Sequence, residues 1–514
     1  MRVALILLFL LFPSVSFSST IIIGSIGEPK RLIPMLSTDS ASSDISSLIF
    51  NGLLKYDKDL NIVGDLAKSF KIEDGGKKIT FYLRKNVLWQ DGVEFTARDV
   101  FFTYKKLTDG TVATPYSGDF LLIKDVKIIS KYIISVEYKV PFAPALSSWM
   151  MGIIPEHILK GKDLNTDIFN RHPIGTGPYK LLRWKAGQEI TLVANPLYFR
   201  DRPRIDKVIY RIIPDASTML LELYTGHIDM MGLNPMQYIY EFKRKMREKF
   251  QVFVTPSAGF TYVGLNLRVK LFSDERVRKA ICYAIDREKI ANTILLGYSD
   301  VYDCIYSPRS FAFQKKKIYN YDPEKARKLL REAGFSDSNR DGYLDKDGKR
   351  FEFTILTNQG NTDRNYAAIM IQQFLKSVGI KINIRILEWQ AFLRLLESGS
   401  FDAVLLGWQL GVDPDEYALW HSSQVKEFNF VYFKNKEVDK LLKKGRETFN
   451  INKRKEIYER INEIIMDKVP YIVLYFPRGI SVVHKRFKGI EQEKAGIMYN
   501  FIEWWVPKKE QMYR

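Results

Sequence analysis

Cysteine and histidine are scarce in this sequence of 514 residues, which contains two cysteines and five histidines. So few cysteines exclude a disulfide-rich scaffold and a cysteine-rich zinc site, and the scattered histidines argue against a histidine-based metal centre. Cys282 lies on the apolar side of an expected helix and should be a small core residue. A disulfide with Cys304 remains an alternative in an oxidising compartment.

Common catalytic motifs are also absent. No glycine-rich loop is followed by the Lys and Ser or Thr that hold nucleotide phosphates, and no serine occupies a nucleophile elbow. Gly175-Thr176-Gly177 is followed by Pro178, so we interpret it as a structural turn. His421 lies close to several acidic residues, but their spacing forces neither a triad nor a metal shell. We therefore expect a protein that is not an enzyme, with a secreted hydrolase as the alternative.

Positive charge dominates, since 78 Lys and Arg against 59 Asp and Glu give a formal net charge of +19. Such a charge would suit nucleic acid if the protein stayed in the cytoplasm. The N-terminus instead predicts export, because Arg2 precedes an apolar run over 3–12 and the small residues Ser16 and Ser18 follow it. No cysteine follows that run, which disfavours a lipid anchor, and no later stretch holds 18 consecutive apolar residues. We expect a soluble periplasmic protein with a signal peptide over 1–18 that binds no nucleic acid.

The second half of the chain alternates between strand and helix patterns. Strands are expected over 351–356, 380–386 and 401–406, and helices over 364–378 and 389–396. Strand–helix–strand units at this spacing indicate an α/β sheet with mainly parallel pairing and right-handed crossovers. Ligands of such sheets bind beyond the carboxyl ends of the strands, and Gly407 and Trp408 lie at one of these ends.

One segment resembles a calcium-binding loop. Its oxygen-bearing side chains near the ligand positions are Asp337, Asn339, Asp341, Asp345 and Asp347. Gly342 stands at the sixth position, as in such loops, but Gly348 replaces the bidentate glutamate expected at the twelfth. Asp347 would have to substitute for that glutamate, and the alternative is an Asx-rich turn between a helix and a strand. No cofactor is required, and a structural calcium ion stays open as a hypothesis.

Five motifs follow one another in the order of a known family. They occupy residues 49–56, 79–100, 174–179 with 195–196, 277–287 and 321–334. The second contains Trp89-Gln90-Asp91-Gly92 and Thr96-Ala97-Arg98-Asp99-Val100, and the third contains Gly175-Thr176-Gly177-Pro178-Tyr179. Together they resemble the family 5 solute-binding proteins of ABC importers, the group that binds oligopeptides and dipeptides. The resemblance covers nearly the whole chain after the signal peptide.

The resemblance implies a type II periplasmic-binding-protein fold with two α/β lobes and a subdomain inserted in the first. Its implied boundaries are 19–37, 174–264 and 473–514 for lobe 1, 38–173 for the inserted subdomain and 265–472 for lobe 2. Strands near 262–267 and 471–476 would cross between the lobes. The resemblance also implies a monomer that closes on a peptide and delivers it to the permease subunits of an ABC transporter in the membrane.

Residues implied to contact the ligand are Ser40, Tyr116, Tyr262, Trp389, Trp408, Gly411, Asp413 and Tyr475. Peptide-binding relatives carry an acidic residue three positions before an acidic-Pro step, where it pairs with the α-ammonium group of the peptide. Leu410 stands there in this sequence, and Asp413 is the nearest carboxylate. Either Asp413 takes that role, or the ligand lacks a free amine there and is an oligosaccharide, a nickel chelate, an opine or another non-peptide solute.

Overall fold

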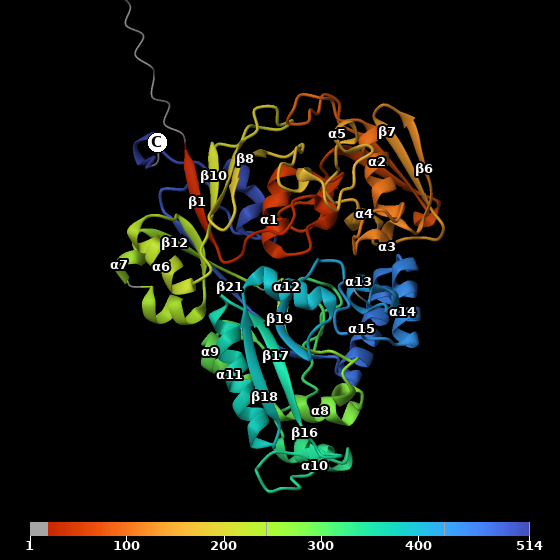
Figure 1. The fold of residues 1–514 in the computed structure, drawn as a ribbon. Helices are drawn as coiled ribbons and strands as arrows, with labels where there is room; N and C mark the ends of the chain where they lie inside the picture. The colour runs from red at the N-terminus through yellow and green to blue at the C-terminus, as the bar shows by residue number, and fades with distance from the viewer. Residues whose placement is uncertain (1–18, 243, 257, 426, 513–514) are drawn as a thin grey trace, which may run out of the picture.

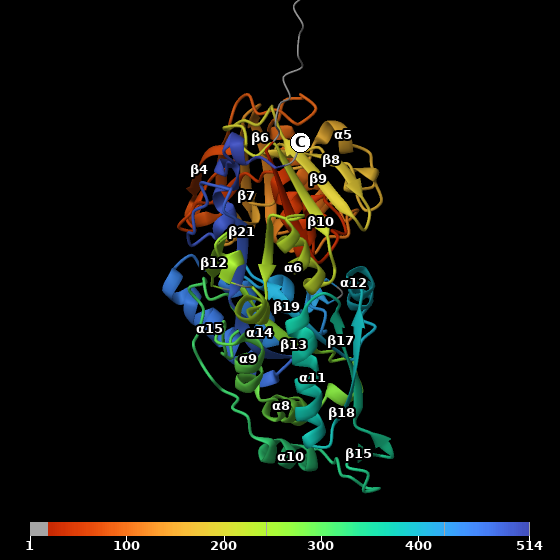
Figure 2. The same cartoon turned by 90° about the vertical axis from the view of Figure 1, so that its left-hand side faces the viewer.

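The structure is a computed structural model that describes residues 19–242, 244–256, 258–425 and 427–512. The predicted signal peptide lies outside these residues. Within them, no helix combines the length and the apolar character needed to cross a membrane. The protein has two lobes, which lie one above the other in Figure 1 and Figure 2. Lobe 1 is the upper one and contains the N-terminal residues, and lobe 2 lies below it.

Lobe 1 is built on a seven-stranded sheet with the order β12-β21-β11-β1-β10-β9-β8. Its elements are β1 (Thr20–Ser25), α1 (Ser40–Ile49), β8 (Tyr179–Lys185), β9 (Glu189–Ala194), β10 (Lys207–Ile212), α6 (Ala216–Thr225), β11 (Met230–Leu233), α7 (Arg244–Arg247), β12 (Phe250–Thr255) and β21 (Gly479–His484). The central strand β1 pairs in parallel with β10 and β11. Its isoleucines Ile21, Ile22 and Ile23 are all buried, as in a strand that is covered on both faces.

The inserted subdomain carries a four-stranded antiparallel sheet with the order β4-β5-β7-β6 and the separate hairpin β2–β3. Its elements are β2 (Leu54–Tyr56), β3 (Ile62–Gly64), β4 (Ala67–Glu73), β5 (Lys78–Leu83), α2 (Ala97–Thr108), α3 (Ser117–Phe120), β6 (Ile123–Ser130), β7 (Ile133–Tyr138), α4 (Ala145–Ser148) and α5 (Glu156–Leu159). α2 begins with a capping box formed by Thr96 and Asp99. One continuous group of buried apolar residues runs from Ile21 through Phe81 to Trp504, so lobe 1 and the subdomain share a core.

Lobe 2 is built on a six-stranded sheet with the order β14-β20-β13-β19-β17-β18. Its elements are β13 (Gly259–Leu265), α8 (Glu275–Ala284), α9 (Arg287–Leu295), β14 (Ser299–Asp300), α10 (Pro323–Glu332), β15 (Asp345–Lys346), β16 (Lys349–Arg350), β17 (Glu352–Asn358), α11 (Thr362–Ser377), β18 (Lys381–Leu387), α12 (Trp389–Ser398), β19 (Ala403–Gln409), α13 (Tyr417–Trp420), α14 (Lys436–Glu447), α15 (Ile451–Lys468) and β20 (Tyr471–Pro477). β17 pairs in parallel with β18 and β19, which confirms the predicted strand–helix–strand units. The rest of the sheet is antiparallel, because β13 runs against both β19 and β20.

The strands of lobe 2 send alternate side chains into two cores. Ile355 belongs to the core under α8, α9, α10 and α11, whereas its neighbour Leu356 belongs to the core that α12, α14 and α15 cover. β18 lies at the sheet edge, where the predicted apolar face is only partly covered. Ile382 is buried as predicted, but Ile386 near the end of the strand is 49% exposed.

The two cysteines do not form a disulfide. Cys282 and Cys304 lie in cores on opposite faces of the lobe 2 sheet, and both are free. Burial raises the pKa of Cys282 to about 12 and that of Cys304 to about 11, so both thiols stay protonated at neutral pH. Both therefore act as small apolar residues, as the sequence predicts for Cys282.

The chain passes from lobe 1 to lobe 2 between β12 and β13 and returns between β20 and β21. β13 and β20 pair with each other within lobe 2, and every residue of β13 is buried. The implied boundaries after residues 264 and 472 therefore fall inside two strands that belong whole to lobe 2. A buried crossover strand and a core strand have the same apolar composition, so the sequence does not distinguish them.

The predicted calcium loop connects α10 to β15 and is closed by its own hydrogen bonds. The carboxylate of Asp337 accepts bonds from the backbone N–H groups of Asp341 (3.1 Å) and of the next residue (3.0 Å). Asp341 forms an ion pair with Arg350, and Asp345 accepts bonds from Ser338 at 3.0 and 2.7 Å. Across the part of the chain that the structure describes, no three His, Cys, Asp or Glu side chains converge as metal ligands. These contacts are those of an Asx-rich turn, and calcium binding stays a prediction.

Thermal unfolding in calcium and in EDTA tests this loop. If the loop binds Ca²⁺, calcium raises the Tm of the wild type, because a ligand that binds only the native state stabilises it. Asp337→Ala combined with Asp341→Ala should abolish that rise. Asp59→Ala, an exposed residue of the subdomain, should not change it. Identical wild-type curves in calcium and in EDTA would contradict the calcium hypothesis.

Candidate ligand-binding cleft

A cavity of about 1040 Å³, the main cavity, lies between the two lobes. Lobe 1 lines it with the residues that follow β1 and with the start of α1. Lobe 2 lines it with Asn358 at the end of β17 and with Gly407, Trp408 and Gln409 at the end of β19. The main cavity thus lies beyond the carboxyl ends of the parallel strands, where the strand pattern predicts a ligand site.

Trp408 forms a rigid aromatic wall of the main cavity. Its ring lies parallel to Phe430, with centroids 5.8 Å apart, and to Tyr262, with centroids 6.3 Å apart. Its Nε1 donates a hydrogen bond to the hydroxyl of Tyr471 (3.2 Å), and Phe428 contacts the ring edge-on. These ring contacts and the hydrogen bond at its nitrogen hold the tryptophan in one orientation, and it lines the cavity as a preformed apolar surface.

Trp389 supplies a second aromatic surface from the first position of α12. Glu388 caps this helix, and the Trp389 ring stacks on Phe392 with centroids 5.9 Å apart. Gly27 of lobe 1 comes so close that a Cβ at that position would lie 3.3 Å from the indole ring. Lobe 1 therefore closes directly onto this tryptophan, and any larger residue at position 27 would have to displace the indole ring slightly.

Three other residues implied by the family resemblance also line the main cavity. Ser40 is exposed at the start of α1, and Gly411 follows β19. Tyr116 of the subdomain donates a hydrogen bond to the backbone oxygen of Ser37 (3.2 Å) and packs edge-on against Phe428 of lobe 2. Burial raises the pKa of Tyr116 to about 12, so its phenol stays neutral at physiological pH.

Tyr262 and Tyr475 do not face the main cavity, which corrects their assignment to the site. Both are buried, on the neighbouring strands β13 and β20, and belong to the cores on opposite faces of the sheet. Tyr262 stacks on Tyr471, with centroids 3.9 Å apart, and supports Trp408 from behind. The sequence identifies these strands, but a strand sends alternate side chains to opposite faces, so position along the chain does not identify the face.

Asp413 is already neutralised within lobe 2. Its carboxylate forms a two-pronged ion pair with Arg454 on α15, at 2.6 and 2.7 Å. The Arg454 side chain is only 7% exposed, so the pair is held largely out of water. Asp413 lines the adjoining cavity described below and not the main cavity. The structure therefore corrects the expectation that Asp413 binds a ligand amine, because an arginine 41 residues away along the chain already holds it.

Arg446 joins the two lobes through a buried ion pair. It lies on α14 of lobe 2, and its Nε donates to both carboxylate oxygens of Asp415 at 3.0 and 2.9 Å. Its Nη2 donates to the carboxylate of Asp119, which belongs to the subdomain on the other side of the cleft. Burial raises the pKa of Asp119, and Arg446 opposes that rise. Because this contact requires the lobes to meet, the structure is a closed form.

Weaker polar contacts close the rest of the rim. Lys30 of lobe 1 pairs with Glu397 of lobe 2 at 2.5 Å, and Asn234 donates to the hydroxyl of Thr362 at 2.7 Å. Exposed ion pairs of this kind contribute up to about 1 kcal/mol each. The side chain of Arg446 is only 5% exposed, so its pair with the opposite lobe is better shielded from water than the pair of Lys30 with Glu397.

Two carboxylates in the main cavity have neither a cationic partner nor a side-chain hydrogen bond among the residues that the structure describes. They are Asp44 on α1 and Glu416 just before α13. Asp39 also lacks a cationic partner among these residues, but it accepts two hydrogen bonds from Ser42. The Asp44 side chain is exposed to the cavity, but desolvation within the cleft, together with the neighbouring carboxylate of Asp39, raises its pKa to about 6. Burial also raises the pKa of Glu416 well above its usual value, and the neighbouring carboxylates of Asp415 and Asp413 add to the rise. A cationic group of a ligand would stabilise the ionised form of either residue.

Arg364 places the opposite charge in the same cavity, from the first turn of α11. Its Nη1 donates to Oδ1 of Asn358 (2.9 Å), but its Nε is buried without a partner among the described residues. Burial lowers the pKa of Arg364 and raises that of the adjacent Asp363 to about 7. A guanidinium that is buried and incompletely bonded favours a carboxylate as its partner.

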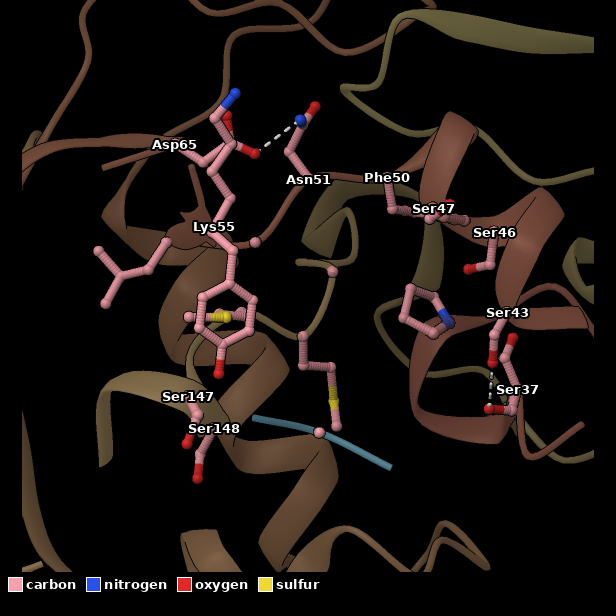
Figure 3. A pocket seen from close by; sticks show the side chains of 18 of the residues that line it. Ser37, Ser43, Ser46, Ser47, Phe50, Asn51, Lys55, Asp65, Ser147 and Ser148 are labelled. Atoms are coloured by element: carbon pink, nitrogen blue, oxygen red, sulfur yellow. Dashed lines mark hydrogen bonds between the residues drawn. The ribbon is translucent and has the colours of Figure 1, made fainter. Parts of the chain in front are cut away.

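A second cavity of about 770 Å³, the side chamber, adjoins the main cavity (Figure 3). Residues that line both are Ser43, Tyr116, Asp119, Gly411, Asp415 and Glu416. Figure 3 shows Ser43, Ser46 and Ser47 of α1 on one side of the chamber and Lys55 with Asp65 on the other. The main cavity and the side chamber are therefore adjacent and share part of their lining.

Sequence reasoning missed Asp44, Arg364 and Glu416. One local signal was present, the acidic segment Asp413-Pro414-Asp415-Glu416. Two of its carboxylates are held by arginines of α14 and α15, which leaves Glu416 without a counter-charge in the described part of the chain. The pairing itself joins distant segments and leaves no periodic pattern in the sequence.

Comparison with known proteins identifies a family and several relatives. The family model of the bacterial extracellular solute-binding proteins, family 5 Middle, matches residues 61–430. The oligopeptide-binding protein AppA of Bacillus subtilis is 36% identical over 505 residues, which cover 95% of this chain and 92% of AppA. The structure of AppA in complex with a nonapeptide matches with a TM-score of 0.91 over 95% of this chain and 99% of that one.

Two further solved structures are similar over the same length. NikZ from Campylobacter jejuni, in complex with Ni(L-His), is 32% identical with a TM-score of 0.87, over 95% of this chain and 99% of NikZ. DppA from Helicobacter pylori, in complex with the peptide STSA, is 26% identical with a TM-score of 0.86, over 96% of this chain and 99% of DppA. The similarity therefore extends across both lobes and the subdomain.

Asp413→Asn should lower the free energy of unfolding by about 3 kcal/mol, because it leaves the buried charge of Arg454 without its partner. Glu416→Gln, in the same loop, is the matched control. It removes a carboxylate that no cation balances, so the free energy of unfolding should stay the same or rise. Urea unfolding of both variants without ligand measures the difference. Wild-type stability of Asp413→Asn would contradict the pairing with Arg454.

Proposed function

Because the chain belongs to family 5 of the bacterial extracellular solute-binding proteins, we propose that it is the capture protein of an ABC importer and that its ligand is a peptide. It binds the peptide between its lobes as a monomer and delivers it to permease subunits in the membrane. The similarity to the oligopeptide-binding protein AppA over nearly the whole length of both chains supports this ligand class.

The observation that carries this proposal is the set of incompletely paired charges in one closed cavity. Glu416 and Asp44 offer carboxylates to an α-ammonium group, and Arg364 offers a guanidinium to a carboxylate. A peptide with free ends carries both charges and satisfies both kinds of group. An uncharged oligosaccharide would leave these groups desolvated and unpaired, which costs several kcal/mol.

The size of the site favours an oligopeptide over a smaller solute. The main cavity of about 1040 Å³ alone reaches the upper end of the usual range for small-molecule pockets, and the side chamber adds to it. A chelate such as the Ni(L-His) bound by NikZ is the second candidate, because its carboxylate would also suit Arg364. The preformed surfaces of Trp389 and Trp408 accept many side chains, so we expect loose sequence preference.

We further propose that the mature protein works in the periplasm, without a lipid anchor, and returns its ligand unchanged. The family consists of substrate-binding proteins of transport systems, which supports binding without chemistry. Incubation of the purified protein with bound peptide, followed by mass spectrometry, should recover the peptide intact. Hydrolysis of the peptide would favour the alternative of a secreted hydrolase.

Acetylation of the peptide N-terminus should weaken binding to the wild type by about 2–5 kcal/mol, since a buried carboxylate then loses its counter-charge. Calorimetry with Ala-Phe-Ala-Phe-Ala and its N-acetyl form measures the loss. Glu416→Gln should remove most of the difference between the two peptides, and Asp44→Asn measures the share of the second carboxylate. Equal binding of free and acetylated peptide to the wild type would exclude recognition of the amine.

The C-terminal amide of the same peptide tests Arg364. Amidation should weaken binding to the wild type, whereas Arg364→Met should bind the acid and the amide equally, because the charge that distinguishes them is gone. Lys289→Met, an exposed cation outside the cavity, is the control and should retain the preference of the wild type for the acid. Loss of affinity for acid and amide alike in Arg364→Met would show that Arg364 only supports the cavity.

Asp119→Asn should weaken peptide binding by about 2 kcal/mol, because it removes the ion pair between the lobes while Arg446 keeps its partner in lobe 2. Small-angle scattering should show that peptide compacts the wild type fully and this variant only at higher peptide concentration. Asp109→Asn, at the exposed end of α2, is the control. Unchanged affinity in Asp119→Asn would show that the pair does not stabilise closure.

A further inference from the structure

The side chamber is a separate space that a short peptide in the main cavity would leave unused. It lies between α1, the strand β2 and the loop that follows β19. Met150, Met151 and Met498 contribute apolar surface, and methionine side chains adapt easily to the shape of a guest. Tyr116 and Glu416 line both spaces, so the side chamber lies directly beside the main cavity.

Most charges of the side chamber are balanced within the protein. Asp65 forms an ion pair with Arg200 at 2.5 Å and accepts a hydrogen bond from Asn51 at 2.8 Å. Asp413 and Asp415 are held by the arginines of α15 and α14. Only two charged side chains of its lining have no ion-pair partner within the described residues. One is Glu416, whose carboxylate lies at the boundary with the main cavity, and the other is a lysine.

That lysine is Lys55 on β2. It lines the side chamber and not the main cavity, and no carboxylate of the described residues lies within ion-pair distance of its ammonium group. Burial, together with the nearby charges of Arg200 and Arg84, lowers the pKa of Lys55, although the carboxylates of Asp65 and Glu503, beyond ion-pair distance, oppose the shift. An anionic guest would reverse the lowering of this pKa, because an opposite charge stabilises the ionised form.

Hydroxyl groups complete the polar lining, and their hydrogen atoms are already in use. Ser47 and Ser147 donate to backbone oxygens at 2.8 Å, and Ser148 donates to the carboxylate of Asp119 at 2.6 Å. Their oxygen atoms keep lone pairs that can accept N–H groups of a guest. The side chamber thus offers acceptors for a peptide backbone and, in Lys55, a cation for a carboxylate.

We propose that the side chamber is a second ligand subsite, in which Lys55 binds a carboxylate of a peptide that extends beyond the main cavity. This inference rests on the proposed function of peptide capture. The carboxylate has two sources. If Glu416 binds the α-ammonium group of the peptide, the carboxylate belongs to an acidic side chain near the N-terminus of the peptide. If Asp44 binds the α-ammonium group, the carboxylate is the C-terminus of a longer peptide.

Two pairs of peptides test this subsite and distinguish the sources. The first pair is Glu-Phe-Ala-Phe-Ala amide and Gln-Phe-Ala-Phe-Ala amide, and the second is a nine-residue peptide without acidic side chains as acid and as amide. Calorimetry measures their affinity for the wild type, for Lys55→Met and for Lys55→Arg. Lys58→Met, an exposed cation in the turn that follows β2, is the matched control.

Lys55→Met should lower the affinity for the charged member of one pair by about tenfold, which is the usual value of a charged hydrogen bond. The affinity for the neutral member of that pair should not change. Lys55→Arg should restore most of the loss. If Lys55→Met weakens binding of the Glu peptide, the carboxylate that Lys55 binds belongs to an acidic side chain. If it weakens binding of the nine-residue acid, that carboxylate is the C-terminus of the peptide. Equal loss for charged and neutral peptides, or no loss at all, would overturn the subsite. If no peptide binds to the wild type, the proposed function fails and this inference fails with it.

Discussion

A buried guanidinium needs carboxylate partners, and Arg446 takes one from each side of the cleft. Asp415 belongs to its own lobe and remains paired whether the lobes are open or closed. Asp119 belongs to the subdomain, which shares its core with lobe 1, so the second pair forms only on closure. This single contact links the internal packing of each lobe to their relative position. The aromatic contact of Tyr116 with Phe428 and the exposed ion pair of Lys30 with Glu397 also cross the cleft.

The same rule, that charges out of water need partners, explains which residues are left for a ligand. The chain pairs Asp413 with Arg454 and Asp65 with Arg200 and so removes them from recognition. Glu416, Asp44, Arg364 and Lys55 remain without an ion-pair partner in the described chain, and each of them lines the main cavity or the side chamber. Asp39, whose carboxylate accepts bonds only from Ser42 in the described chain, adds a third acid. Unpaired groups of both signs in one cleft fit a zwitterionic ligand. The tryptophans add apolar surface that does not select particular side chains.

Much of the fold is predictable from the sequence, because the burial of one face of a helix or strand makes apolar residues recur at a regular spacing. The strands and helices over 351–408 appear within a few residues of their predicted positions, and the predicted strand of alternating isoleucines is β18. Trp389 and Trp408 line the main cavity. The strand pattern nominates Trp408 and the family resemblance implies both tryptophans, and their contact with a ligand stays a prediction. Tyr262 and Tyr475 do not line the main cavity, although the family resemblance implies that they do. The sequence identifies the strands on which they lie, but it does not show which face of the sheet each side chain is on. Asp413 was misassigned because its arginine lies 41 residues away, and such pairing has no local signature.

The central claim is that the free charges of the cleft are there to hold both ends of a peptide. Native mass spectrometry of the protein isolated from a bacterial periplasm, followed by release and sequencing of the bound material, tests it most directly. The account predicts short peptides of mixed sequence with an unmodified amine and a free carboxylate. A retained sugar or metal chelate, or peptides with blocked ends, would contradict it.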